Sequence, residues 1–122
     1  MVNILIIAVL IILIYVFFKV KNTQHKTFSI ILTVWNRQEI IKRAIRSILN
    51  QTYGNFELIV VNDGSSDKTL ENINSFTDER ITVISLKQNS GRVVARNRGM
   101  LVAKNDWICW LDSDDEYLSI YL

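Results

Sequence analysis

The sequence has no proline, four glycines and a single cysteine in 122 residues. One cysteine cannot form an intrachain disulfide, which excludes a small secreted scaffold held by disulfides and indicates a reducing compartment. Cys109 lies in an apolar run, so it is expected to be a small core residue rather than a nucleophile. Because proline is missing, every turn must rely on Gly, Asn, Asp and Ser.

An excess of positive charge is missing from most of the chain. There are 14 lysines and arginines and 12 acidic residues, and the excess of two corresponds to Lys19 and Lys21. The residues that follow carry 12 charges of each sign. Domains that bind nucleic acids usually carry a net basic surface. The charge balance therefore predicts no nucleic-acid partner.

One long hydrophobic run is present, from Ile4 to Phe18. Counted from Met1, it gives 18 residues, which in a helix would span about 27 Å, close to the thickness of a bilayer. The sequence thus predicts a transmembrane anchor over residues 1–20. A cleaved signal peptide is disfavoured because no basic region precedes the run and no small-residue cleavage site ends it.

The charges beside this run predict its orientation. No lysine or arginine precedes the run, whereas three lysines follow it within a few residues: Lys19, Lys21 and Lys26. Positive residues favour the cytoplasmic side. We therefore expect a single-pass membrane protein with a connector over 21–27 and a cytoplasmic domain over 28–122.

The remainder alternates between two kinds of pattern. Short apolar runs rich in β-branched residues predict strands at 28–34, 56–61, 81–86 and 107–111, of which the first, second and last are expected to be buried. Apolar residues at helical spacing predict three helices, one capped by Asn36 and ending near Leu49, one around Leu70 to Phe76, and one from Arg92 to Ala103. The order β-α-β-α-β-α-β predicts a doubly wound α/β fold with a mostly parallel sheet. Ligands of such folds bind at the carboxyl ends of the strands.

An acidic stretch follows the last predicted strand. Asp112, Asp114, Asp115 and Glu116 lie within five residues, and crowded carboxylates of this kind suit Mg²⁺ or Mn²⁺. The alternative is a helix start, in which Asp115 and Glu116 are first-turn acids and residues 117–122 continue the helix. Both interpretations stay open on this stretch alone.

Two further groups of polar residues lie near predicted strand ends. Asp63 follows the second strand and could accept hydrogen bonds from a nucleoside, or could cap a turn. The segment from Lys87 to Lys104 has five basic residues and no acidic one. Arg96 and Arg98 are two apart and cannot share a helix face, so at least one should turn toward the strand ends.

Five motifs in the same order and spacing resemble the family-2 glycosyltransferases of GT-A (Rossmann-like) fold. They lie at residues 28–37, 47–53, 56–67, 89–99 and 111–115, and include Val61-Asn62-Asp63-Gly64-Ser65, Ala95-Arg96-Asn97-Arg98-Gly99 and Asp112-Ser113-Asp114. The resemblance covers the chain from Phe28 to its end. Thr33 stands where many members have proline, and Asn62 where many have an aspartate.

The resemblance implies an enzyme that takes a sugar from a nucleotide-diphosphate-sugar donor. The acceptor would be a cell-surface polysaccharide or a lipid-linked saccharide. By this resemblance, Thr33 and Asp63 would line the nucleoside pocket and Arg96 would lie near the nucleotide. The Asp112-Ser113-Asp114 (DxD) signature would hold the ribose and a Mn²⁺ or Mg²⁺ ion on the diphosphate, with Asp115 as a second candidate ligand.

The same resemblance leaves the catalytic base unassigned. The acceptor half of the family, which carries the base, would follow Leu122, so the domain over 28–122 is expected to be truncated after the DxD motif. The alternative function is a non-catalytic module that binds nucleotide sugars or partners.

Overall fold

The computed structural model describes residues 3–21 and 26–122. Helix α1 (Ile4–Lys21) precedes an α/β domain in which strands and helices alternate along the described chain. The elements of the domain are β1 (Phe28–Val34), α2 (Ile41–Leu49), β2 (Phe56–Asn62), α3 (Thr69–Asn74), β3 (Ile81–Ser85), α4 (Arg92–Val102) and β4 (Trp107–Asp112). The predicted alternation of strands and helices is confirmed, whereas most of the predicted connector falls at 22–25, outside the described residues.

The strands form one parallel sheet in the order β3-β2-β1-β4. The chain runs outward from β1 through β2 to β3, and then crosses to the other side of β1 to add β4. The direction of winding therefore reverses between β1 and β4, and in α/β sheets this reversal opens a crevice at the carboxyl ends of the two strands. Thr33 and Asp112 are register partners there.

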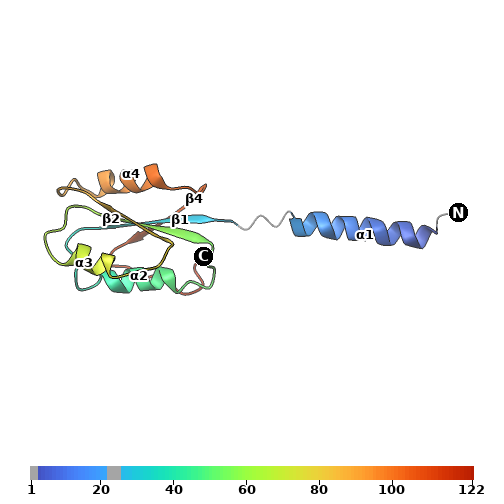
Figure 1. Ribbon diagram of the computed structural model, residues 1–122, viewed down its shortest axis with the longest axis horizontal. Helices are drawn as coiled ribbons and strands as arrows, with labels where there is room; N and C mark the ends of the chain where they lie inside the picture. Colours follow the sequence, from blue (N-terminus) through green and yellow to red (C-terminus); the bar gives the residue numbers. More distant parts are fainter. Residues whose placement is uncertain (1–2, 22–25) are drawn as a thin grey trace.

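Helices cover both faces of the sheet, with α4 on one face and α2 and α3 on the other (Figure 1). Alternate residues of β1 point to opposite faces: Ile31 packs with Ala95 of α4, whereas Ile30 and Leu32 pack with α2 residues such as Ile45. Since β1 is apolar on both faces, it reads as a continuous hydrophobic run. The expectation of a buried strand is confirmed for β1 and β2. It is wrong for β4, which lies at the edge of the sheet and is half-buried or exposed at every position but Leu111.

The start of α2 differs from the prediction. The helix begins at Ile41 rather than after Asn36, and a turn at Arg37–Ile40 precedes it. Asn36 adopts a positive φ of 47°, and its side-chain Oδ1 accepts a hydrogen bond from Ser66 N at 2.8 Å. The side chain that would cap α2 instead joins the β1 loop to the β2 loop, which is a tertiary contact that the local pattern does not contain.

The helix expected over 117–122 is not formed. Residues 113–122 contain only turns and irregular backbone, held against α2 by the buried side chain of Gln51. Its Nε2 donates to Leu118 O at 2.6 Å and its Oε1 accepts from Leu122 N at 3.1 Å. The helix-start interpretation of the acidic stretch is therefore wrong.

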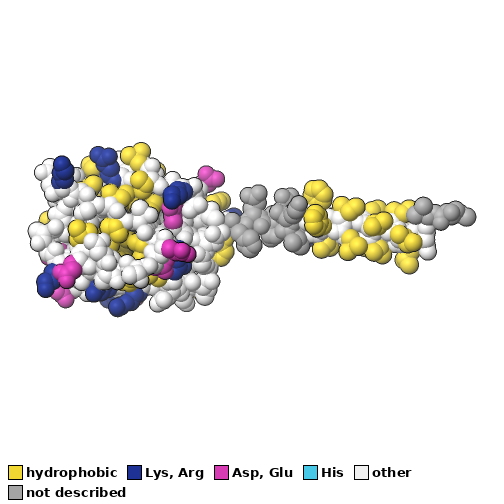
Figure 2. Space-filling model, in the orientation of Figure 1, with side chains coloured by type: hydrophobic (Ala, Val, Ile, Leu, Met, Phe, Trp, Pro, Cys, Tyr) yellow, Lys and Arg dark blue, Asp and Glu magenta, His cyan; other side chains and the backbone are white. Residues whose placement is uncertain are grey.

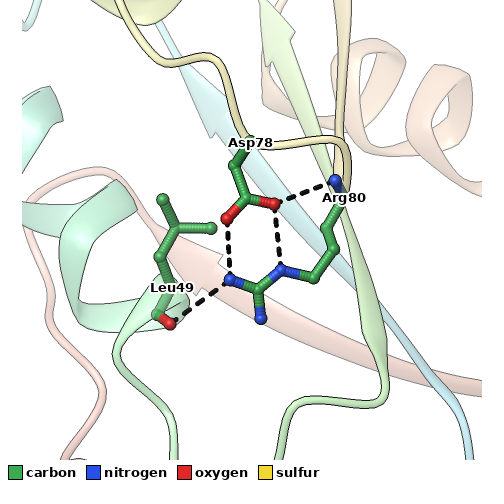
Figure 3. A network of polar contacts seen from close by, with 3 residues as sticks. All are labelled: Leu49, Asp78 and Arg80. Atoms are coloured by element: carbon green, nitrogen blue, oxygen red, sulfur yellow. Dashed lines mark hydrogen bonds and ion pairs between the residues drawn. The ribbon is translucent and has the colours of Figure 1, made fainter.

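A network of three residues lies at the end of the sheet opposite the β1–β4 crevice. Figure 3 shows its members, Leu49, Asp78 and Arg80. Asp78 accepts from Arg80 Nη2 at 2.7 Å and from Arg80 Nε at 2.9 Å, and Arg80 Nη2 reaches Leu49 O at 3.5 Å. The Arg80 guanidinium also lies 4.5 Å from the centre of the Phe56 ring. The network joins the end of α2 to the loop before β3.

Helix α1 carries exposed apolar side chains, drawn in yellow along its described length in Figure 2. Its apolar part, Ile4 to Phe18, is 15 residues, or about 22 Å of helix, against a hydrocarbon core of about 30 Å. In the described part of the chain no helix is long and apolar enough to cross a membrane. The prediction of a transmembrane anchor over 1–20 is corrected accordingly.

Candidate active site

A cavity of about 310 Å³ opens at the carboxyl ends of β1, β2 and β4, at the reversal of winding. The loops after these strands and the first residues of α4 supply its walls. The lining residues are Thr33, Val34, Trp35, Arg37, Asp63, Asn89, Gly91, Arg92, Ala95, Asp112, Ser113 and Asp114.

Three residues selected from the sequence meet in this cavity from neighbouring strands. Thr33, at the end of β1, is almost fully buried, and its register partner Asp112 ends β4. Asp114 follows two residues later and is exposed. The aromatic ring of Trp35 is 49% exposed beside them, so the cavity combines carboxylates with an accessible aromatic surface.

Arg96 turns toward the strand ends, as the spacing of Arg96 and Arg98 predicted. Its Nη2 forms an ion pair with Asp112 Oδ1 at 2.8 Å, and its guanidinium lies 5.3 Å from the centre of the Trp110 ring. Both charged side chains keep more than a third of their surface exposed. Arg96 therefore contacts the cavity through Asp112 rather than lining it.

Two other arginines line the cavity, and the sequence interpretation did not select them. Arg37 follows β1 and Arg92 is the first residue of α4. The sequence held one signal for Arg92, because a residue that opens a helix after a β-strand of an α/β fold lies at the carboxyl edge of the sheet. Both side chains are exposed, and they add positive charge to the cavity that Asp112 and Asp114 also line.

Asp63 directly follows β2, is only 4% exposed and lines the cavity on the side of that strand. Its Oδ1 accepts from Ser90 N at 2.8 Å and its Oδ2 accepts from Gly91 N at 2.9 Å. Its own backbone N donates to Val34 O at 2.8 Å. The side chain thus binds the loop between β3 and α4 with both oxygens.

Asp115 and Glu116 lie apart from this cavity. Asp115 borders a neighbouring hollow together with Trp110 and Tyr117, and Glu116 forms an ion pair with Arg43 at 2.5 Å. Burial raises the pKa of Tyr117 well above its ordinary value; its hydroxyl donates to Trp110 O at 2.7 Å. Of the four acids in the stretch, the structure brings only Asp112 and Asp114 into the cavity.

The carboxylates of the cavity fit a divalent cation only in combination with a ligand. In residues 3–21 and 26–122 no three His, Cys, Asp or Glu side chains gather in a metal-binding cluster. Mg²⁺ is commonly held by one or two carboxylates plus substrate phosphates. Asp112 and Asp114 supply that number and type of ligand, so the site fits a cation that arrives with a diphosphate.

The sequence model for glycosyl transferase family 2 matches residues 29–122. The chain belongs to glycosyl transferase family 2. Among its relatives, a putative colanic acid biosynthesis glycosyl transferase, WcaA of Escherichia coli K12, is 38% identical over 105 residues, 81% of this chain and 38% of its own length. The E. coli UDP-Glc:alpha-D-GlcNAc-diphosphoundecaprenol beta-1,3-glucosyltransferase WfgD is 38% identical over 91 residues, 75% of this chain and 36% of its length.

Solved structures of the family agree with the fold. Staphylococcus aureus TarS 1-349 in complex with UDP superposes with a TM-score of 0.72 at 28% identity, covering 77% of this chain and 29% of that one. The predicted family and the parallel α/β sheet of GT-A type are confirmed. The family-2 chain described here spans little more than a third of the length of the curated relatives quoted above.

Proposed function

We propose that residues 28–122 form the donor-binding part of a glycosyltransferase. The enzyme would transfer a sugar from a nucleotide-diphosphate-sugar donor to a cell-surface polysaccharide or a lipid-linked acceptor. The observation that carries this proposal is the convergence of Thr33, Asp112 and Asp114 in one cavity at the β1–β4 crevice. Crevices at such reversal points are the usual nucleotide sites of α/β sheets. Relatives that act on or are bound to UDP compounds support a nucleotide-sugar donor.

The charges of the cavity suit the chemistry of the donor. In glycosyl transfer the bond between the anomeric carbon and the diphosphate oxygen breaks, and an acceptor oxygen takes its place on that carbon. Arg37 and Arg92 line the cavity with positive charge where the diphosphate would lie, and such preorganised charge favours a leaving group that becomes more negative. Trp35 offers a ring surface for the base.

Asp112 and Asp114 are the residues proposed to hold a Mn²⁺ or Mg²⁺ ion. When bound, the ion offsets the negative charge that develops on the departing diphosphate without a proton transfer. Asp112 is paired with Arg96 in the described structure, whereas the side chain of Asp114 is exposed. We therefore propose Asp114 as the direct ligand and Asp112 as the residue that contacts the ribose or shares the ion.

A titration of the full chain tests the donor site. UDP and GDP, each with and without Mn²⁺, are titrated into the purified protein by calorimetry. Asp114→Ala is expected to abolish the dependence of nucleotide binding on Mn²⁺, while Asp106→Asn, an exposed acid at the other end of the sheet, leaves it intact. Full metal dependence in Asp114→Ala would move the ligand to Asp112 or Asp115. Binding of neither nucleotide by the parent chain would refute the donor site.

We also propose that α1 attaches the protein to a membrane, with the domain on the cytoplasmic side. A helix that is apolar on all sides needs a non-aqueous environment, and the lysines that follow it are attracted to the anionic lipids of the cytoplasmic leaflet. Protease added to intact cells should leave the domain uncut. Recovery of the protein in the soluble fraction, or cleavage of the domain in sealed cells, would refute this placement.

A second candidate function is a non-catalytic nucleotide-sugar-binding module. Transfer requires a base within hydrogen-bond reach of the acceptor, and the described cavity lining contains three carboxylates, Asp63, Asp112 and Asp114. Asp63 is bound to backbone, and the other two are assigned to the donor and its ion. A radiolabelled donor assay separates the candidates, because multiple-turnover transfer by this chain would exclude the binding module.

A further inference from the structure

The carboxylate of Asp63 is committed within the protein. Each oxygen accepts one backbone N–H from the loop before α4, from Ser90 at 2.8 Å and from Gly91 at 2.9 Å. Charge-assisted hydrogen bonds of this length are among the stronger ones in proteins. Because the carboxylate is 4% exposed, its bonds to the loop face little competition from water.

The next residue fixes the same loop by close packing. Gly64 has a positive φ of 67°, and a Cβ placed there would lie 2.2 Å from the carbonyl carbon of Gln88 and 2.5 Å from Asn89 N. Both are backbone atoms, so a side chain at residue 64 could fit only if the loop moved. The Asp63-Gly64 turn therefore holds the loop by two hydrogen bonds and by direct contact of backbone with backbone.

The loop that is held in this way forms one wall of the cavity. Asn89, Gly91 and Arg92 all line it, and Gly91 O accepts the hydrogen bond of Ala95 N at 3.0 Å, which begins α4. Displacing the loop would thus move both the wall and the start of the helix that carries Arg92. In the described structure, the position of Arg92 depends on the bonds of Asp63.

We propose that Asp63 is a positioning residue, which fixes the 88–91 loop and the first turn of α4 for the nucleotide diphosphate. This role adds to the direct contact with the nucleoside that the family resemblance implies for this aspartate, because Asp63 lines the cavity and each of its oxygens keeps a further lone pair. The proposal rests on the donor site proposed above, and Gly64 acts in it together with Asp63. Part of the effect of Asp63 on nucleotide affinity is then exerted through the loop.

Amide hydrogen exchange of the full chain without nucleotide tests the positioning role by itself. Ser90 and Gly91 amides are expected to exchange slowly in the parent protein, and to stay protected when UDP is added. Asp63→Ala should release the Ser90 amide fully and the Gly91 amide in part, because Gly91 N also donates to Asn89 Oδ1 at 3.2 Å. Asp63→Asn, which keeps one acceptor oxygen, should retain more protection than Asp63→Ala. Fast exchange of both amides in the parent protein, or loss of their protection on UDP binding, would overturn the proposal.

Nucleotide affinity then shows whether Asp63 acts through the loop. Gly64→Ala leaves the carboxylate in place and displaces the loop, so under this proposal it weakens UDP binding about tenfold, and the double variant with Asp63→Ala loses less affinity than the two single losses combined. Gly54→Ala is the matched control, because its Cβ would meet no atom within 4 Å. Fully additive losses, or normal affinity in Gly64→Ala, would show that Asp63 does not act through the loop. If the parent chain binds neither UDP nor GDP, the donor site fails and the amide exchange alone decides the role of Asp63.

Discussion

Replacing Asp78 by alanine should make the domain less stable at neutral pH. Asp78 binds the Arg80 guanidinium through both oxygens and also accepts from Arg80 N at 2.9 Å (Figure 3). These bonds hold the pKa of Asp78 at about 2, below its ordinary value of 3.8. Without the carboxylate, the partly buried Arg80 would lose its bidentate partner and keep the weaker contacts with Leu49 O and the Phe56 ring.

The pKa of Asp78 sets the size of this effect. One pKa unit is worth about 1.4 kcal/mol, so the fall from 3.8 to about 2 gives an upper bound of about 2.5 kcal/mol. Both side chains keep about a quarter of their surface exposed, and solvent weakens such pairs. We therefore expect a loss of about 1 to 2 kcal/mol, which lowers the Tm of a domain of this size by about 5 to 10 °C.

The loss should depend on pH with a defined sign. Because the folded pKa is depressed, the stabilisation is complete above pH 3.8 and disappears as the pH falls through about 2. Thermal unfolding of the full chain, followed by circular dichroism between pH 7 and pH 2, should show the parent and Asp78→Ala converging at the acid end. Glu79→Ala, which removes an exposed acid one residue away, is the control and should change Tm by less than about 2 °C.

Two results would refute this reasoning. If Asp78→Ala and Glu79→Ala have equal Tm at pH 7, the ion pair contributes only general charge. If the gap between the parent and Asp78→Ala stays constant down to pH 2, the loss arises from packing rather than from the ionised carboxylate.

Three further predictions follow from the packing of the domain. Gly99→Ala should lower the free energy of unfolding by about 1 to 2 kcal/mol in urea titrations. Its Cβ would lie 2.5 Å from Cγ2 of the buried Ile31, and this clash outweighs the gain in helix propensity. A variant more stable than the parent would contradict this. Gln51→Ala should make residues 113–122 accessible to chymotrypsin, which would cleave at Tyr117, whereas Asn50→Ala, at an exposed position, should not. Equal cleavage of the two variants would exclude Gln51 as the side chain that holds residues 113–122 in place. Burial raises the pKa of the Cys109 thiol, so its reaction with a disulfide reagent at pH 8 should be much slower in the folded chain than in urea, and equal rates would contradict its burial.

Periodicity located all four strands from their apolar, β-branched runs, although only the central strands β1 and β2 are buried along almost their whole length and the edge strands β3 and β4 are not. Phe28 to Val34 is apolar at every position but two, and the alternation of strands with helices then implied parallel pairing and a site at the carboxyl edge of the sheet. The family resemblance added residue roles to that edge. Of these, the structure gathers Thr33, Asp63, Asp112 and Asp114 in one cavity.

Tertiary contacts decided what local patterns could not contain. Asn36 resembles a helix cap in the sequence, yet it binds Ser66, 30 residues away, because the loops after β1 and β2 meet at the crevice. Arg92 rather than Arg96 lines the cavity, because Arg92 is the first residue of α4 at the carboxyl edge of the sheet, whereas Arg96 is paired with Asp112.

The sequence by itself determined the family, the order of strands and helices and the edge of the sheet at which acids and threonine converge, because burial periodicity and motif spacing are local properties. Only the tertiary structure decided the partners of those residues. Asp63 stands in the sequence as a free carboxylate after a strand, and the fold places both of its oxygens on Ser90 and Gly91. Hydrogen bonds between segments 27 residues apart depend on how the chain is packed, and no pattern of neighbouring residues records them.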